Sequence, residues 1–135
     1  MKITVQTTVR APIERVWEAW TTPADIVRWN AASDDWHTPY ATNDVREGGL
    51  FSWRMEARDG SVGFDFAGRY TRIVPNELIE YTLGDERLVT VEFIQGSGDV
   101  TVIETFDTEE VNDADLQRRG WQAILDRFKS HVEST

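Results

Sequence analysis

The side chains best suited to acid–base chemistry lie together in one irregular segment, residues 30–39. Asp34, Asp35 and His37 could exchange protons with a bound molecule, and Trp36 could stack on it. The same residue types are also typical of a turn, in which Asp and Ser side chains bond to nearby backbone. The sequence alone leaves both interpretations open.

Glu104 is a second candidate, because it interrupts the alternating segment 100–106. Val102, Glu104 and Phe106 share one face of the predicted strand. If that face is covered, a carboxylate lies among apolar side chains, where it must pair, take up a proton or meet water. If Ile103 faces inward instead, Glu104 is solvated. Both orientations remain open, because both faces carry apolar residues.

No motif for a metal or a cofactor is present. The chain has no Cys, which excludes thiolate metal ligands, disulfides and a Cys nucleophile. Its two histidines, His37 and His131, are far apart, and no His-x-x-x-His pair occurs. P-loop, dinucleotide and Gly-x-Ser-x-Gly motifs are absent as well. We therefore expect no metal site and no cofactor, and the sequence favours a binding protein over an enzyme.

Periodicity predicts the elements that position these residues. A strand is expected over residues 3–9, then a helix that begins near Pro12 and a second helix that begins at Thr22-Pro23. Asp25 lies three residues after Thr22, which predicts a capping box with Asp in place of Glu. The stripe of the first helix consists of Ile13, Val16, Trp17 and Trp20.

Five further strand-like runs follow the irregular segment, separated by Gly, Pro, Asn and Asp turns. They cover residues 51–58, 64–74, 78–83, 88–94 and 100–106. Short connections predict antiparallel hairpins, and one face of the sheet is consistently aromatic, so it needs a cover. The last segment supplies it: Asn112 or Asp113 can cap a helix whose apolar residues are Leu116, Trp121, Ile124, Leu125, Phe128 and Val132.

These elements predict an α+β fold in one domain, residues 1–135: a curved antiparallel sheet of about seven strands wrapped around a long C-terminal helix. An apolar or aromatic ligand is expected in a cavity of about 300 Å³ or more between them. A solid core is the alternative. Gly120, inside the last helix, indicates either close approach to the sheet or room for the ligand. The candidate ligand-binding residues are Trp29, Trp36, His37, Trp53, Met55, Phe64, Phe66, Tyr70, Phe93, Glu104, Phe106, Trp121 and Phe128.

An enzyme would need two polar groups that converge on the ligand. The pairs that the sequence suggests are Glu104 with Tyr70 and Asp35 with His37. The net charge of −10 argues against nucleic acid and anionic membranes as partners. No apolar run is long enough to span a bilayer and no signal-peptide core is present, so a cytoplasmic protein is expected.

Several motifs resemble the START-like superfamily, also called helix-grip or SRPBCC proteins, and within it the bacterial homologues of the heat-shock-protein-90 ATPase activator. They are residues 11–20, Pro23, Trp29, Gly48-Gly49, residues 68–70, residues 75–79 and residues 120–128.

The resemblance implies a helix-grip fold with a cavity for lipids, polyketides or aromatic metabolites. In some branches of the superfamily the protein also does chemistry on that ligand, so an enzyme of cyclase, dehydratase or hydrolase type is the alternative function. The branch name also implies chaperone co-activation or another stress-related interaction. A small hydrophobic molecule is the expected partner, and a chaperone and a homodimer are left open.

Overall fold

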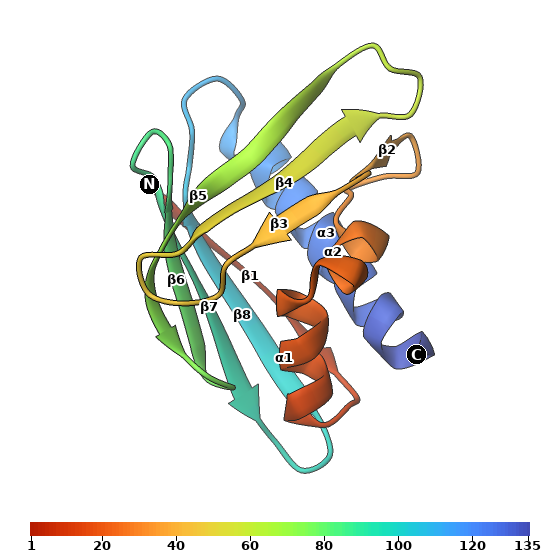
Figure 1. The fold of residues 1–135 in the computed structure, drawn as a ribbon, viewed down its shortest axis with the longest axis vertical. Coiled ribbons are helices and arrows are strands. Elements are labelled where there is room, and N and C mark those ends of the chain that lie inside the picture. Colours follow the sequence, from red (N-terminus) through yellow and green to blue (C-terminus); the bar gives the residue numbers. More distant parts are fainter.

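The computed structural model describes residues 1–135 as an antiparallel sheet that curls around a long helix (Figure 1). The predicted helix-grip fold is confirmed, and two short strands, β2 and β3, are added to the expected elements. In chain order the elements are β1 (Lys2–Val9), α1 (Ile13–Thr21), α2 (Pro23–Trp29), β2 (Trp36–His37), β3 (Ala41–Asn43), β4 (Leu50–Ala57), β5 (Gly63–Val74), β6 (Leu78–Leu83), β7 (Leu88–Gln95), β8 (Val100–Asp107) and α3 (Ala114–Ser134).

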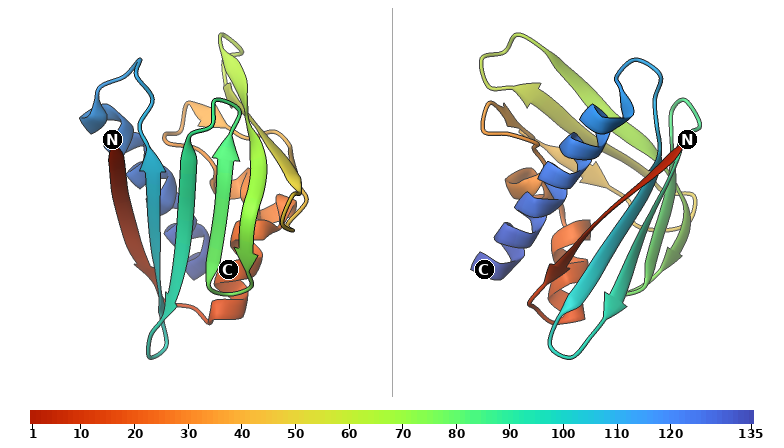
Figure 2. Two further views of the ribbon diagram at one scale, coloured as in Figure 1. Left: turned by 90° about the vertical axis from the view of Figure 1, so that its left-hand side faces the viewer. Right: turned by 180° about the vertical axis from the view of Figure 1, so that it is seen from behind.

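The sheet contains eight strands in the order β1-β8-β7-β6-β5-β4-β2, with β3 also paired to β4. Neighbouring strands are antiparallel throughout. From β4 to β8 the chain runs through successive hairpins, and β1 then pairs with β8 (Figure 2). The curled sheet therefore has one concave face, and the predicted aromatic side chains lie on it.

Alternation along the strands sorts side chains between the two faces as expected. On β4, Phe51 and Trp53 are buried, whereas the intervening Ser52 is partly exposed. On β8, Val102, Glu104 and Phe106 are all buried. The question left open for Glu104 is thereby answered: its side chain is on the concave face, and Ile103 is on the other.

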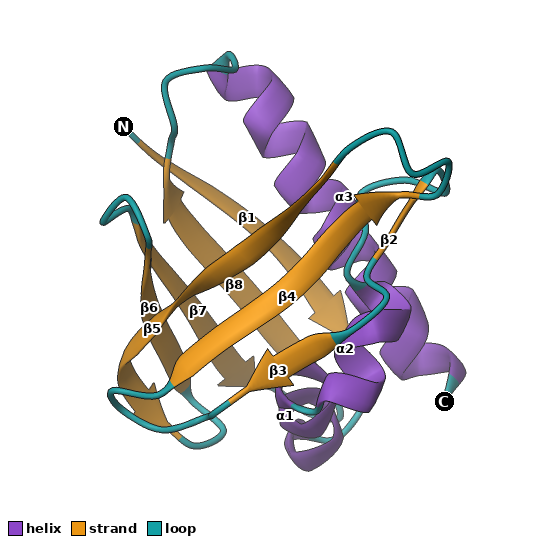
Figure 3. Ribbon diagram, turned by 45° about the horizontal axis from the view of Figure 1, so that its top comes forward, coloured by secondary structure: helices purple, strands orange, loops and turns teal.

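Helix α3 crosses the open side of this concave face (Figure 3). Its closest backbone neighbours are β1, α1 and α2. Phe128 packs against two tryptophans of the short helices, with ring centroids 4.9 Å from Trp20 and 5.0 Å from Trp29. The Trp29 indole N–H donates to the Ala19 carbonyl at 2.9 Å, which joins α2 to α1. The three helices are thus held together by one aromatic cluster.

Polar contacts hold both ends of α3. Asp113 caps the helix, its carboxylate accepting a hydrogen bond from the Leu116 N–H at 2.7 Å. At the other end, His131 Nε2 lies 2.7 Å from Asp25 Oδ1, and Arg15 donates to the same carboxylate at 2.9 Å. The predicted capping box of α2 is therefore wrong. Asp25 joins α2 to α1 and α3 instead.

Two further expectations about α3 are corrected. Leu116 does not belong to the core, because it lies in the first turn and is 48% exposed. Gly120 does not approach the sheet closely, because a Cβ atom there would meet no other atom within 4 Å. It is also not among the residues that line the pocket described below. None of the three helices is long and apolar enough to cross a membrane.

Replacing Gly120 with Ala is expected to stabilise the protein by about 0.5–1 kcal/mol, because Ala loses less conformational entropy and the new methyl group has room. Gly48→Ala is the matched control: its Cβ would also have room, but φ is +84°. That variant should lose about 1–2 kcal/mol, because the left-handed conformation is unfavourable for Ala. Urea unfolding of both variants measures the difference. A destabilised Gly120→Ala would show that this helix requires glycine at that position.

Candidate functional site

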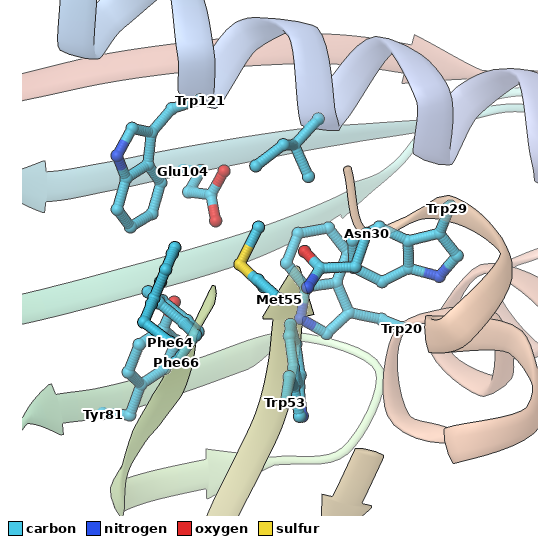
Figure 4. A pocket seen from close by; sticks show the side chains of 11 residues that line it. Trp20, Trp29, Asn30, Trp53, Met55, Phe64, Phe66, Tyr81, Glu104 and Trp121 are labelled. Atoms are coloured by element: carbon cyan, nitrogen blue, oxygen red, sulfur yellow. The ribbon is translucent and has the colours of Figure 1, made fainter. Parts of the chain in front are cut away.

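One apolar pocket lies between the sheet and α3, with a cavity volume of about 140 Å³. Figure 4 shows the side chains around it, contributed by both layers of the fold. This volume is about half the minimum that we expected from typical ligand sites. The reason is that Trp20, Trp29 and Phe128 pack against one another and fill much of the interior.

The lining residues reach the pocket because of their positions along each element. On β4, Trp53 and Met55 are two residues apart and so point to the same side, as Phe64 and Phe66 do on β5. On α3, Trp121 and Ile124 are three residues apart and share a helix face. The complete lining is Trp20, Trp29, Asn30, Trp53, Met55, Phe64, Phe66, Tyr81, Glu104, Trp121 and Ile124.

The pocket reaches the surface between β5 and α3. Phe64 is 47% exposed, and Trp121 and Ile124 are partly exposed, whereas the lining residues from α1, β4 and β8 are buried. Trp36 packs edge-on against Phe64, with ring centroids 6.1 Å apart. A ligand would therefore enter beside Phe64 and meet the buried tryptophans at the closed end.

Glu104 is the one acidic side chain in the pocket, and it is only 5% exposed. Its neighbours across the adjacent strands are Val5 and Val91, and its carboxyl group points into the pocket between Trp121 and Met55 (Figure 4). Burial raises its pKa from 4.5 to about 8, and no hydrogen bond or neighbouring charge opposes this shift. At neutral pH the pocket therefore holds a protonated carboxyl group.

Three other polar groups border the pocket. Burial, together with the nearby Glu104, raises the pKa of the Tyr81 hydroxyl well above its usual value. The Asn30 amide N–H donates to the Thr38 hydroxyl at 3.1 Å, which fixes the orientation of that side chain. The buried Trp53 Nε1 has no hydrogen-bond partner. An unpaired buried donor costs about 1–3 kcal/mol, so this indole N–H lowers the stability of the fold.

Seven of the thirteen predicted ligand-binding residues line the pocket: Trp29, Trp53, Met55, Phe64, Phe66, Glu104 and Trp121. The structure places the other six outside the lining. Among the rings, Phe93 packs on Trp17 and Trp20, Phe106 stacks on Trp121 at 4.1 Å, and Phe128 belongs to the helix cluster. The Tyr70 hydroxyl donates to Asn43 Oδ1.

The irregular segment 30–39 contains a turn and the short strand β2, and its acidic side chains bond to neighbouring residues. Ser33 donates to the Asp35 carboxylate, and Arg127 of α3 pairs with Asp34. His37 lies in β2 with its Nε2 atom 3.8 Å from a carboxylate oxygen of Glu56. Neither suggested pair, Asp35 with His37 or Glu104 with Tyr70, converges in the pocket. The structure also contains no group of three or more His, Asp or Glu side chains arranged to hold a metal.

Sequence analysis missed four lining residues, and a signal existed for three of them. Trp20 and Ile124 had been recognised as members of helical stripes, and Tyr81 alternates with the buried Ile79 of its strand. Asn30 gave no signal, because it follows the last residue of α2 and reaches the pocket only through the tertiary fold.

Replacing Glu104 with Gln tests whether the Glu104 carboxyl group is protonated in the folded protein. In the wild type, the folded protein binds the Glu104 proton more tightly than the unfolded chain does, because the folded-state pKa is raised. This contribution to the free energy of unfolding is fully present below pH 4.5 and is lost as the pH rises through about 8. Glu104→Gln cannot ionise, so its stability relative to the wild type should rise by roughly 3 kcal/mol between acidic and neutral pH. Urea unfolding across this range measures the change.

The control is Glu92→Gln, at an exposed position on the neighbouring strand β7. It should follow the wild-type profile, because its carboxyl group is solvated. A Glu104→Gln profile parallel to that of the wild type would show that Glu104 is ionised normally in the folded protein.

Comparisons with known proteins agree with this architecture. The AHSA1-like protein from Aeromonas hydrophila is 45% identical, with a TM-score of 0.93 over 99% of this chain and 93% of that chain. A protein from Cytophaga hutchinsonii is 50% identical, with a TM-score of 0.86 over 98% of this chain and 92% of that chain. A protein from Chromobacterium violaceum, 23% identical with a TM-score of 0.86 over 98% of both chains, shares the fold.

No curated protein sequence matches the chain significantly. The family model described as "Activator of Hsp90 ATPase homolog 1-like protein" matches residues 10–133, almost the whole chain. The match agrees with the START-like motifs in the sequence, and the chain belongs to the family of Activator of Hsp90 ATPase homolog 1-like proteins.

Proposed function

We propose that this protein binds one small organic molecule, with a body about the size of a single ring, in the pocket between the sheet and α3. The observation that carries the proposal is the pocket itself, which stays open within an otherwise close-packed aromatic interior. Protein interiors contain few voids larger than a water molecule, so an apolar space of this size indicates a binding site.

The volume and the lining restrict the ligand. An apolar cavity of about 150 Å³ holds a molecule such as benzene, so a pocket of about 140 Å³ suits one ring or a compact branched group. Lipids and polyketides, which the family resemblance suggested, are larger and would need the mouth beside Phe64 to widen. A compact ligand is therefore the better match for the pocket.

The alternatives draw less support from the site. An enzyme needs converging acid and base groups, and the only titratable side chains in the lining are Glu104 and Tyr81. The family's description refers to the Hsp90 ATPase, so a role as a chaperone partner is the second candidate function. The pocket is the feature of the structure on which this proposal rests.

The pair Ile124→Trp and Leu116→Trp tests binding in the pocket. Ile124 lines the cavity and a larger ring there should occupy much of it, whereas Leu116 is exposed on the same helix. With toluene and phenol as probes, we expect the wild type and Leu116→Trp to bind with equal affinity and Ile124→Trp to bind at least about tenfold more weakly. NMR titration of backbone amides measures both affinity and location.

The proposal is contradicted if neither probe binds the wild type. It is also contradicted if Ile124→Trp, shown to be folded by its NMR spectrum, binds the probes as tightly as Leu116→Trp does.

A further inference from the structure

We propose that the preferred ligand of this pocket is a small organic cation, a substituted ammonium group held between Glu104 and the surrounding aromatic rings. This inference rests on the proposed function and specifies the chemical class of its ligand. Three features of the pocket support it: the rings, the isolated acidic group and the absence of any basic side chain in the lining.

Aromatic rings form most of the wall. Seven of the eleven lining residues are aromatic, and four of those seven are tryptophans: Trp20, Trp29, Trp53 and Trp121. The face of an aromatic ring carries negative potential, and Trp binds cations more strongly than Phe or Tyr does. Cages of aromatic side chains are the usual protein site for quaternary ammonium groups. A purely apolar ligand would be served equally well by Leu, Ile and Val, of which the lining contains only Ile124.

Glu104 supplies the charge that a buried cation needs. A lone cation is strongly disfavoured inside a protein, and a lone carboxylate is equally disfavoured. When both are present, their attraction offsets part of the cost of burying each charge. Within the protein Glu104 has no charged partner, because Val5 and Val91 flank it and the lining contains no Lys, Arg or His. An ammonium ligand would therefore form an ion pair with Glu104, for which the protein itself supplies no cation.

Charge also disfavours the opposite class of ligand. A carboxylate or phosphate would meet the acidic Glu104 with no basic side chain to balance it. The whole chain carries a net charge of −10, which attracts cations and repels anions before they reach the pocket. A neutral ligand remains compatible, since it would accept a hydrogen bond from the protonated Glu104, and the experiment distinguishes it from a cation.

The test compares choline with 3,3-dimethylbutan-1-ol, which has the same shape but a carbon atom in place of the charged nitrogen. We expect wild-type protein to bind choline at least about tenfold more tightly than the alcohol near pH 8.5. Near pH 6 the preference should shrink, because choline must first displace the proton of Glu104. Tyr81 is the only other titratable side chain in the lining, and its raised pKa keeps it protonated at both pH values.

Isothermal titration calorimetry in buffers with different ionisation enthalpies should show release of most of one proton per choline bound near neutral pH. Glu104→Gln should lose the preference for choline while still binding the alcohol. Glu92→Gln, changed at an exposed position on β7, should behave like the wild type.

Each other outcome has a distinct meaning. Equal or tighter binding of the alcohol by the wild type overturns the cation proposal and indicates a neutral ligand. Binding of toluene without any binding of choline overturns it too, but leaves the proposed pocket function intact. Failure of every probe, toluene and phenol included, overturns both.

Discussion

Phe128 packs against both Trp20 and Trp29, and this aromatic contact joins α3 to the two short helices. The ends of the helix are held by polar contacts, at Asp113 on one side and at the Asp25–His131 pair on the other. Between these points α3 cannot move closer to β4 and β5 without displacing the aromatic cluster. The pocket is therefore the space that remains beneath the middle of a helix fixed along its length.

Within that space, Glu104 is the position at which stability and function conflict. A strand that alternates as β8 does would be more stable with an apolar residue facing inward, as Val102 and Phe106 do. The carboxyl group instead remains in the pocket without a partner. A buried titratable group without a partner is typical of a binding site, where a ligand supplies the missing interaction.

Much of this fold was predictable from sequence, because alternation and helical spacing are local properties. The strands of the sheet, α3 and its Asp113 cap were read from such patterns. The orientation of Glu104 was not predictable, since apolar residues lie on both faces of its strand and only the position of α3 decides which face is covered. Asp25 was misassigned for a similar reason: its partners Arg15 and His131 come from other helices.

The pocket marks a second limit of sequence analysis. Phe106 and Trp53 have the same character in sequence, yet Phe106 stacks on Trp121 within the core and Trp53 lines the cavity. Rings that fill an interior and rings that surround an empty space produce the same periodicity. The volume was overestimated because periodicity does not reveal how closely Trp20, Trp29 and Phe128 pack.

The ionisation of Glu104 is the property on which the account of the site depends, and it can be measured directly. Its side-chain carboxyl carbon, observed by ¹³C NMR in the ligand-free protein, reports protonation as the pH is varied. The structure predicts a midpoint at about 8, caused by burial alone. A midpoint near the ordinary value of 4.5 would contradict it, because Glu104 would then be solvated or paired and the pocket would not contain an isolated buried acid.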